Sequence, residues 1–497
     1  MNLLRDYQKK AITDIRQLFL KGKKRILLVA PTGSGKTVIA SSMLEQSKEK
    51  GNFGLFVAHR RELVMQCSRK LAEFEIKHGV IMANKSANMY ADIQIVSIQT
   101  FNARIGRDDF IKPLATLIII DEAHRSTSSS FKKLIAQYPD AWVIGLTATP
   151  CRADGKGLGN IYQELVECGN IKELTAKGYL VPNRIVAPTI PDLQNIRIVA
   201  GDYEKSTLDK RMNTPKLVGD IVSHWIKHGE NRPTVVFGVS IKHSKYIANI
   251  FRQNGIPSGH IDGEMPEIER EEQLEKLNKG EIKVLSNCMV LTEGWDQPKV
   301  SCVIIARPTK SYSLYLQMVG RSLRPAPNKK DTLIIDHSGC VYEHGFPEDV
   351  PKWELKTSVD KERKKKEPEP IERQPFTCVQ CDTVYKPTKD DPACPNCAFV
   401  PTKKEKMILI QQGRLVELPK MKPNAQDKEN FYAQLVYYAK QKGYKEGWAS
   451  WTFKRKYGHF PHTKKVFPVA TGKEVISFIQ HCNIARAKSK HIKEFNL

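Results

Sequence analysis

A glycine-rich stretch at residues 30–37, APTGSGKT, constrains the fold of this chain more than any other feature. An apolar run at 26–29 precedes it and a helix-like run at 38–47 follows. Strand, glycine-rich loop and helix in this order are the context of a phosphate-binding loop. Gly33 and Gly35 leave room for backbone N–H groups to surround an anion, and the start of the following helix adds unpaired N–H groups. The sequence therefore predicts a nucleotide phosphate site here.

Side chains of this loop and of the first predicted helix can contact the phosphates, the Mg²⁺ ion and the adenine base of a nucleotide. Lys36 can reach the β- and γ-phosphates, and the Thr37 hydroxyl can ligate Mg²⁺. The predicted nucleotide contacts of the loop are Thr32, Gly33, Ser34, Gly35, Lys36 and Thr37. A helix predicted at 4–20 opens with Arg5 and Gln8, which we expect to contact the nucleotide too. The Gln8 amide both donates and accepts, so it can select adenine.

Apolar, strand-like runs alternate with helix-length segments over most of the chain. Such alternation is typical of parallel sheets covered by helices on both faces. The runs fall into an early block and a late block, which predicts two sheets. Strands are predicted at 26–29, 54–58, 93–100, 117–120 and 142–146, and then at 234–239, 281–286, 303–306 and 333–337. A crossover between the blocks is expected at 177–182.

An acidic pair, Asp121 and Glu122, directly follows the isoleucine-rich run at 117–120. Ligands of parallel sheets bind at the carboxyl ends of the strands, so this pair should face the phosphate loop. We expect Asp121 to hold Mg²⁺, directly or through water, and Glu122 to polarise the attacking water. An acidic turn at a strand end is the alternative interpretation.

The charge balance indicates a polyanionic partner. The 497 residues carry a formal net charge of +25. Residues 401–497 hold 20 Lys and Arg against 7 Asp and Glu, which gives +13 for this fifth of the chain. Nucleic acid is the simplest partner for such a surplus. The first residues lack the apolar core of a signal peptide and no apolar run is long enough to cross a membrane, so a cytoplasmic protein without a membrane partner is expected.

Four of the eleven cysteines form two C-x2-C pairs separated by twelve residues: Cys378, Cys381, Cys394 and Cys397. This spacing suits a tetrahedral, structural Zn²⁺ held by four thiolates. A redox-active pair is the alternative. We interpret the other seven cysteines as buried apolar residues.

Two further segments lie around the cysteine cluster. Residues 356–375 are charged and apolar-poor, which predicts a linker. Residues 401–497 interleave basic and aromatic side chains, most densely at 431–438 and 447–458. The aromatics could stack on nucleic-acid bases, or they could form a small helical core with a solvated basic face. Both interpretations remain open.

The order of these motifs resembles that of superfamily 2 DEAD/DEAH-type helicases over residues 1 to about 345. The shared features include the loop at Lys36, the sequence DEAH at 121–124 and the sequence TAT at 147–149. The sequences TATP at 147–150 and TEGWD at 292–296 look more like DNA-acting members. These include RadD-like DNA repair helicases and restriction-enzyme helicase subunits.

The resemblance implies a fold and further site residues. Residues 1–185 would form a RecA-like ATP-binding domain and 186–355 a second RecA-like domain. A zinc ribbon at 376–400 and a basic, mainly helical region at 401–497 would follow. Gln317, Arg321 and Arg324 would act on the γ-phosphate from the second domain, with at least one arginine as a finger, and Gly294 and Asp296 would contact the nucleotide. The nucleic-acid contacts implied are Arg60, Arg61, Gln99, Thr100, Thr147 and Thr149.

The expected function is an ATP-dependent DNA helicase or translocase with Mg²⁺ as cofactor. Movement in the 3′→5′ direction and a role in repair, recombination or replication are implied by the resemblance. Its DNA would be single-stranded, forked or branched, and a repair or recombination protein is a possible partner. Three alternatives stay open: an RNA helicase or RNA sensor, a translocase that does not separate strands, and an ATP-switched DNA-binding accessory protein with little turnover.

Overall fold

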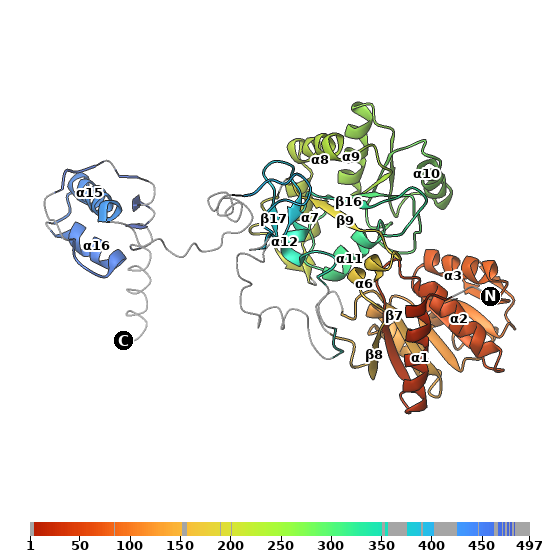
Figure 1. The fold of residues 1–497 in the computed structure, drawn as a ribbon. Coiled ribbons are helices and arrows are strands. Elements are labelled where there is room, and N and C mark those ends of the chain that lie inside the picture. Colours follow the sequence, from red (N-terminus) through yellow and green to blue (C-terminus); the bar gives the residue numbers. More distant parts are fainter. Residues whose placement is uncertain are drawn as a thin grey trace, which may run out of the picture. The chain divides into compact units, whose positions relative to one another are not determined.

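The computed structural model describes residues 4–349, 353–355, 375–401 and most of 425–482, with short gaps at 84, 152–156, 189, 200 and 389–390. The predicted linker at 356–375 lies almost wholly outside the described residues, as does the start of the predicted 401–497 region. The chain divides into two compact units, residues 1–413 and 414–497 (Figure 1). None of the described helices has the length and apolar character needed to cross a bilayer.

The first lobe is built on an eight-stranded sheet in the order β4-β3-β5-β2-β6-β7-β1-β8. All neighbours are parallel except β3 and β4. The strands are β1 (Arg25–Val29), β2 (Gly54–Ala58), β3 (Gly79–Met82), β4 (Lys85–Ala87), β5 (Ile93–Ser97), β6 (Leu117–Ile120), β7 (Trp142–Thr147) and β8 (Glu164–Glu167). The helical segments are α1 (Asp6–Leu20), α2 (Lys36–Lys48), α3 (Arg61–Glu73), α4 (Ile98–Arg104), η1 (Ala123–Arg125), α5 (Ser129–Ala136) and α6 (Ile171–Ala176).

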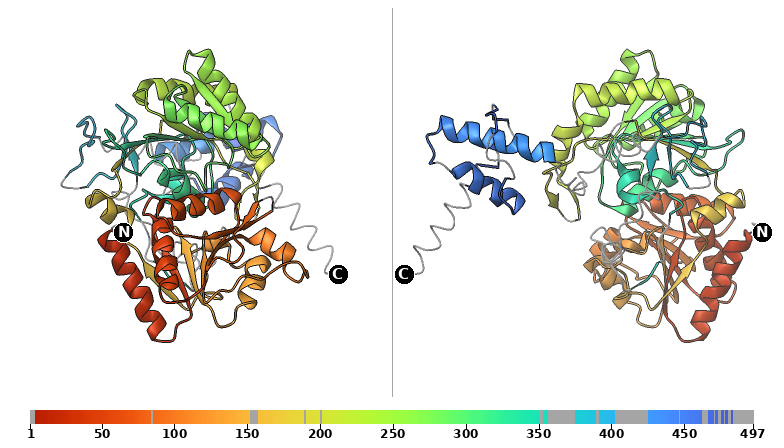
Figure 2. Two further views of the ribbon diagram at one scale, coloured as in Figure 1. Left: turned by 90° about the vertical axis from the view of Figure 1, so that its right-hand side faces the viewer. Right: turned by 60° about the vertical axis from the view of Figure 1, so that its left-hand side comes forward.

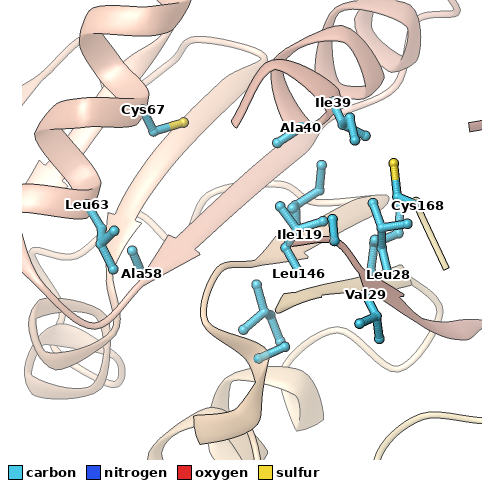
Figure 3. Close-up of a cluster of buried hydrophobic side chains, with 14 of the residues drawn as sticks. Leu28, Val29, Ile39, Ala40, Ala58, Leu63, Cys67, Ile119, Leu146 and Cys168 are labelled. Carbon is cyan, nitrogen blue, oxygen red and sulfur yellow. The ribbon is translucent and has the colours of Figure 1, made fainter. Parts of the chain in front are cut away.

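The central strands of this lobe are apolar on both faces, because helices cover both. Leu28 of β1 and Ile119 of β6 are fully buried. Ile39 of α2 and Leu63 of α3 contribute to the same core (Figure 3). Parallel strands buried on both faces have continuous apolar runs, which is why the sequence predicted these strands.

The predicted strands at 281–286 and 234–239 are shorter in the structure, as β14 (Val284–Asn287) and β12 (Thr234–Phe237), and a third predicted strand runs into a helix. The strand expected at 93–100 ends at Ser97, and α4 begins at Ile98. Ile98 and Phe101 are three residues apart, so a helix buries both on one face, whereas a strand would point them to opposite sides.

The second lobe has a six-stranded parallel sheet in the order β13-β14-β12-β15-β16-β9. Its strands are β9 (Asn183–Val186), β12 (Thr234–Phe237), β13 (Ser258–Ile261), β14 (Val284–Asn287), β15 (Cys302–Ile305) and β16 (Thr332–Asp336), with a short hairpin of β10 (Ile198–Val199) and β11 (Asp202–Tyr203). Its helices are α7 (Lys205–Met212), α8 (Pro215–His228), α9 (Ile241–Gln253), α10 (Glu267–Lys279), α11 (Tyr312–Gly320) and α12 (Cys340–His344). The expected crossover at 177–182 thus leads into β9, an edge strand of the second sheet.

A small cysteine-bearing module, residues 375–401, lies against the second lobe. It contains the hairpin β17 (Phe376–Thr377) and β18 (Val384–Tyr385). Thr383 forms an antiparallel bridge with Val186, so the module covers the outer edge of β9. The Asp382 carboxylate accepts hydrogen bonds from Lys227 Nζ at 2.7 Å and His228 Nε2 at 3.0 Å, both on α8. These contacts attach the module to the lobe.

The second unit contains α15 (Ala425–Gln441) and α16 (Trp448–Tyr457), which pack on each other (Figure 2). Together with the two parallel-sheet lobes, this confirms the predicted fold class: two tandem RecA-like α/β domains, a four-cysteine module and a helical C-terminal region.

Candidate nucleotide-binding site between the lobes

The glycine-rich loop closes around its own lysine. Gly35 caps the start of α2 with φ +81°, and a Cβ there would lie 2.6 Å from Gln8 Nε2. Lys36 Nζ donates to the carbonyls of Ala30 at 3.0 Å and Pro31 at 3.3 Å. Burial lowers the pKa of Lys36, and the carboxylates of the acidic pair oppose this shift. A phosphate oxygen would be a stronger acceptor for this buried ammonium than the two carbonyls.

The start of α1 fastens the loop. Gln8 Nε2 donates to Ser34 O at 2.9 Å and Gln8 Oε1 accepts from Arg5 N at 3.0 Å. Tyr7 Oη donates to the same Ser34 carbonyl at 2.8 Å. The Arg5 guanidinium lies 4.7 Å from the ring centroid of Tyr179. The predicted residues Arg5 and Gln8 therefore lie beside the loop, and the sequence analysis missed Tyr7 and Tyr179.

The acidic pair follows β6 at the carboxyl edge of the sheet. Asp121 Oδ1 accepts from Glu122 N at 2.9 Å, and Glu122 has an unusual positive φ of 48°. Burial and the Glu122 charge raise the pKa of Asp121 to about 7. Although burial acts to raise the pKa of Glu122, His124, whose Nδ1 lies 3.3 Å from Glu122 Oε2, and the Lys36 charge outweigh it and lower that pKa. Two oppositely shifted carboxyls beside a buried lysine are typical of a functional site.

The second lobe faces this site with α11 and the turn that follows it. Gln317 and Arg321 are buried, and the side chain of Arg324 lies beside Gly33. A Cβ on Gly320 would overlap the Thr32 side chain, so the lobes meet closely at the phosphate loop. The structure therefore brings the predicted second-lobe residues to the predicted phosphate site.

Both arginines are held by the 292–296 segment of their own lobe. Arg321 donates to Thr292 O through Nε at 3.1 Å and Nη2 at 2.6 Å, and to Trp295 O through Nη1 at 2.7 Å. Arg324 pairs with the Asp296 carboxylate. Burial and the Arg324 charge lower the pKa of Arg321 to about 10. Gly294, with φ +71°, approaches Glu62 so closely that a Cβ would lie 2.8 Å from the Glu62 Cβ.

The predicted nucleic-acid contacts are mostly engaged within the protein. Arg61 Nη1 lies 2.9 Å from Glu267 Oε2 of α10, and Gln99 Nε2 donates to His59 O at 2.6 Å. Thr147 Oγ1 donates to Thr149 O at 2.8 Å, and Thr149 Oγ1 donates to Ser313 Oγ of the second lobe at 2.6 Å. Thr100 is buried. Arg61 and Thr149 thus contact the second lobe, whereas the contacts of Gln99 and Thr147 stay within the first lobe. The role of the whole group in nucleic-acid binding stays a prediction.

An ion cluster around the buried carboxylate of Glu293 joins the lobes, and the sequence analysis did not select this residue. Glu293 Oε2 lies 2.8 Å from Arg60 Nε and 3.0 Å from His59 Nε2, and Oε1 lies 3.2 Å from Arg125 Nη2. The carboxylate is 4% exposed. Despite burial, the His59 hydrogen bond and the two guanidiniums hold the Glu293 pKa well below its usual range. Arg125 directly follows the DEAH sequence, so the cluster links the acidic pair to the second lobe.

The four predicted zinc ligands converge in the described residues. Their sulfur atoms all lie within 4.8 Å of one another. Cys378 Sγ is 3.5 Å from Cys397 Sγ, and Cys381 Sγ is 3.6 Å from Cys394 Sγ. Tetrahedral coordination with Zn–S bonds near 2.3 Å requires sulfur separations of about 3.8 Å. The donor set and its spacing therefore fit Zn²⁺.

Family models match both lobes. Residues 2–152 match "Type III restriction enzyme, res subunit", and residues 215–326 match "Helicase conserved C-terminal domain". With the fold and the divided site, these matches identify the lobes as those of a superfamily 2 helicase with restriction-enzyme-like relatives. This confirms the resemblance that the motifs predicted.

Individual relatives agree with this assignment. IRC3 of Saccharomyces cerevisiae, named as an ATP-dependent helicase, is 32% identical over 358 residues, which cover 68% of this chain and 52% of that protein. The chain thus spans about half the length of this relative. DNA 3′-5′ translocase XPB2 of Sulfurisphaera tokodaii is 24% identical over 375 residues, 67% of this chain and 81% of that protein. An HsdR-subunit fragment of a type I restriction enzyme from Vibrio vulnificus has the same fold, with a TM-score of 0.55 at 23% identity, covering 70% of this chain and 68% of that fragment.

Proposed function

We propose that this chain is a DNA-dependent ATPase that moves along or unwinds DNA. One observation carries the proposal: the phosphate loop and acidic pair of the first lobe meet Arg321 and Arg324 of the second. A γ-phosphate contacted from both lobes makes closure depend on ATP, and hydrolysis then releases the contact. The net charge of +25 and the DNA translocase XPB2 among the relatives support DNA as the strand.

Each residue of the site has a defined task in this proposal. Lys36 holds the β- and γ-phosphates, Thr37 and Asp121 would ligate Mg²⁺, and Glu122 orients and deprotonates the attacking water. Mg²⁺ would neutralise charge on the phosphates, and its charge would keep Asp121 ionised. Arg324 is the better-placed finger, because its side chain lies beside Gly33. Its Nη1 contacts Trp295 O and the Asp296 carboxylate, whereas all three guanidinium nitrogens of Arg321 donate to backbone carbonyls of its own lobe.

The polarity of movement gives the direct test of DNA motor activity. We expect ATP-dependent displacement of a labelled strand from a duplex with a 3′ single-stranded tail, and little from one with a 5′ tail. Lys36→Ala should displace neither. Displacement of strands from RNA duplexes only would show that the protein is an RNA helicase. ATP binding without stimulated turnover on DNA or RNA would indicate an ATP switch. A role in repair, recombination or replication stays a prediction, as does a protein partner.

We also propose that the four cysteines hold one structural Zn²⁺. Purified protein should contain about one zinc per chain by elemental analysis, and Cys378→Ser should lose most of it because three thiolates bind Zn²⁺ more weakly than four. Cys482→Ser, outside the cluster, is the matched control and should keep its zinc. A zinc-free wild-type protein with a Cys378–Cys381 or Cys394–Cys397 disulfide would support the redox alternative instead.

A further inference from the structure

Three aromatic side chains in the described part of the second unit are buried: Phe431, Tyr432 and Phe453. Phe431, Tyr432 and Leu435 of α15 pack against Phe453 of α16 and Ile479 to form a small apolar core. For these residues the structure supports the core interpretation over base stacking. The aromatics that remain outside the core are therefore the informative ones.

Two aromatic side chains stay in solvent next to a lysine. Trp451 is 65% exposed and Phe460 is 44% exposed, and their ring centroids are 5.2 Å apart. Lys454 Nζ lies 5.2 Å from the Trp451 centroid and 4.4 Å from that of Phe460. We call these three residues the aromatic–lysine patch. Exposed apolar rings are unfavourable in water, and such a patch is typical of a binding surface.

The sequence around the patch is strongly basic, which favours a polyanionic ligand. Between residues 440 and 456 the chain has six basic residues, Lys440, Lys442, Lys445, Lys454, Arg455 and Lys456, against one acidic residue, Glu446. Single-stranded nucleic acid presents planar bases and phosphates in alternation. Exposed aromatic rings take the bases by stacking, and neighbouring lysines neutralise the phosphates.

We propose that the aromatic–lysine patch is a second binding site for single-stranded nucleic acid, separate from the motor lobes. Trp451 and Phe460 stack on bases, and Lys454 contacts a phosphate. The inference rests on the proposed function in one respect: the bound strand is the one on which the lobes act. Base stacking is tolerant of sequence, so the site holds the strand without reading it.

The test measures binding by the full chain without nucleotide. Fluorescence anisotropy compares a labelled oligo-dT with an abasic oligomer of equal length. Trp451→Ala should weaken oligo-dT binding about tenfold and leave abasic binding nearly unchanged, because the variant loses the ring on which a base stacks but keeps the charges that contact phosphates. Trp451→Phe, which keeps a ring, should retain most of the affinity. Lys454→Gln should reduce the salt slope by about 0.7.

Controls separate this proposal from the motor proposal. Lys440→Gln removes an exposed charge of the same unit but neither ring, so it should leave the preference for oligo-dT over the abasic strand intact. At saturating DNA, Trp451→Ala should hydrolyse ATP at the wild-type rate. Wild-type affinity of Trp451→Ala for oligo-dT, or equal losses on both strands, would overturn the stacking site. If DNA does not stimulate hydrolysis by the wild-type chain, but its affinity for oligo-dT depends on Trp451, then the motor proposal is contradicted and the binding-site proposal stands.

Discussion

Glu122→Gln should lower the rate of DNA-stimulated ATP hydrolysis by about 10²–10⁴-fold and leave ATP binding intact. The amide keeps the shape of the carboxylate but cannot accept a proton from the attacking water, and general-base catalysis is worth about this factor. Glu122 is buried beside Lys36 and its pKa is lowered, so it is ionised and ready to act as the base at neutral pH.

The measurement is phosphate release at saturating ATP and DNA, together with ATP affinity. Glu49→Gln is the matched control, because Glu49 lies directly after α2 and its side chain is exposed. This variant should hydrolyse ATP at the wild-type rate. Lys36→Ala should also abolish turnover, but through loss of phosphate contact, so its ATP affinity should fall. Turnover of Glu122→Gln within a few-fold of wild type would exclude Glu122 as the base.

The second large effect is expected at Glu293. Glu293→Gln leaves two guanidiniums and an imidazole around a neutral amide in a buried position. Removing one partner of a fully buried ion pair costs about 3–5 kcal/mol, and the cost is smaller here because Arg60 and Arg125 are 27% and 45% exposed. Glu293 belongs to the second lobe and its three partners belong to the first. The substitution should therefore destabilise the closed arrangement of the two lobes. We expect stimulated kcat/KM for ATP to fall at least tenfold.

The chain offers a matched control across the same boundary. Glu267 of α10 pairs with Arg61 of α3 at 2.9 Å, but the two side chains are 41% and 52% exposed. Exposed pairs contribute only about 0–1 kcal/mol, so Glu267→Gln should change kcat/KM less than threefold. Equal effects of the two substitutions, or none from Glu293→Gln, would show that the Glu293 cluster does not drive closure.

The sequence predicted what depends on local pattern. The phosphate loop, the acidic pair and the cysteine ligands each occupy a short segment whose spacing sets the chemistry, and the continuous apolar runs defined the buried strands. The end of β5 was missed because Ile98 adds one more apolar residue after Val96 although the helix has already begun there.

Contacts between segments far apart in the chain could not be predicted from the sequence. Arg125 and Glu293 are 168 residues apart, and no local pattern indicates that they pair. The contact of Arg60 with Glu293 was likewise not foreseen, and the role in nucleic-acid binding that the resemblance implied for Arg60 stays a prediction. The exposure of Trp451 could not be predicted either. Helical spacing alone does not show which of several aromatic residues are buried in the small core of the second unit.

The most direct test of the central claim is steady-state ATP hydrolysis by the purified chain at one moderate salt concentration. The rate is measured alone and with single-stranded DNA, duplex DNA, forked DNA or RNA. The two-lobe site predicts slow basal hydrolysis and strong stimulation by DNA, with little stimulation by RNA and none in Lys36→Ala. Hydrolysis that no nucleic acid changes would contradict a motor in which strand binding and ATP close the same two lobes.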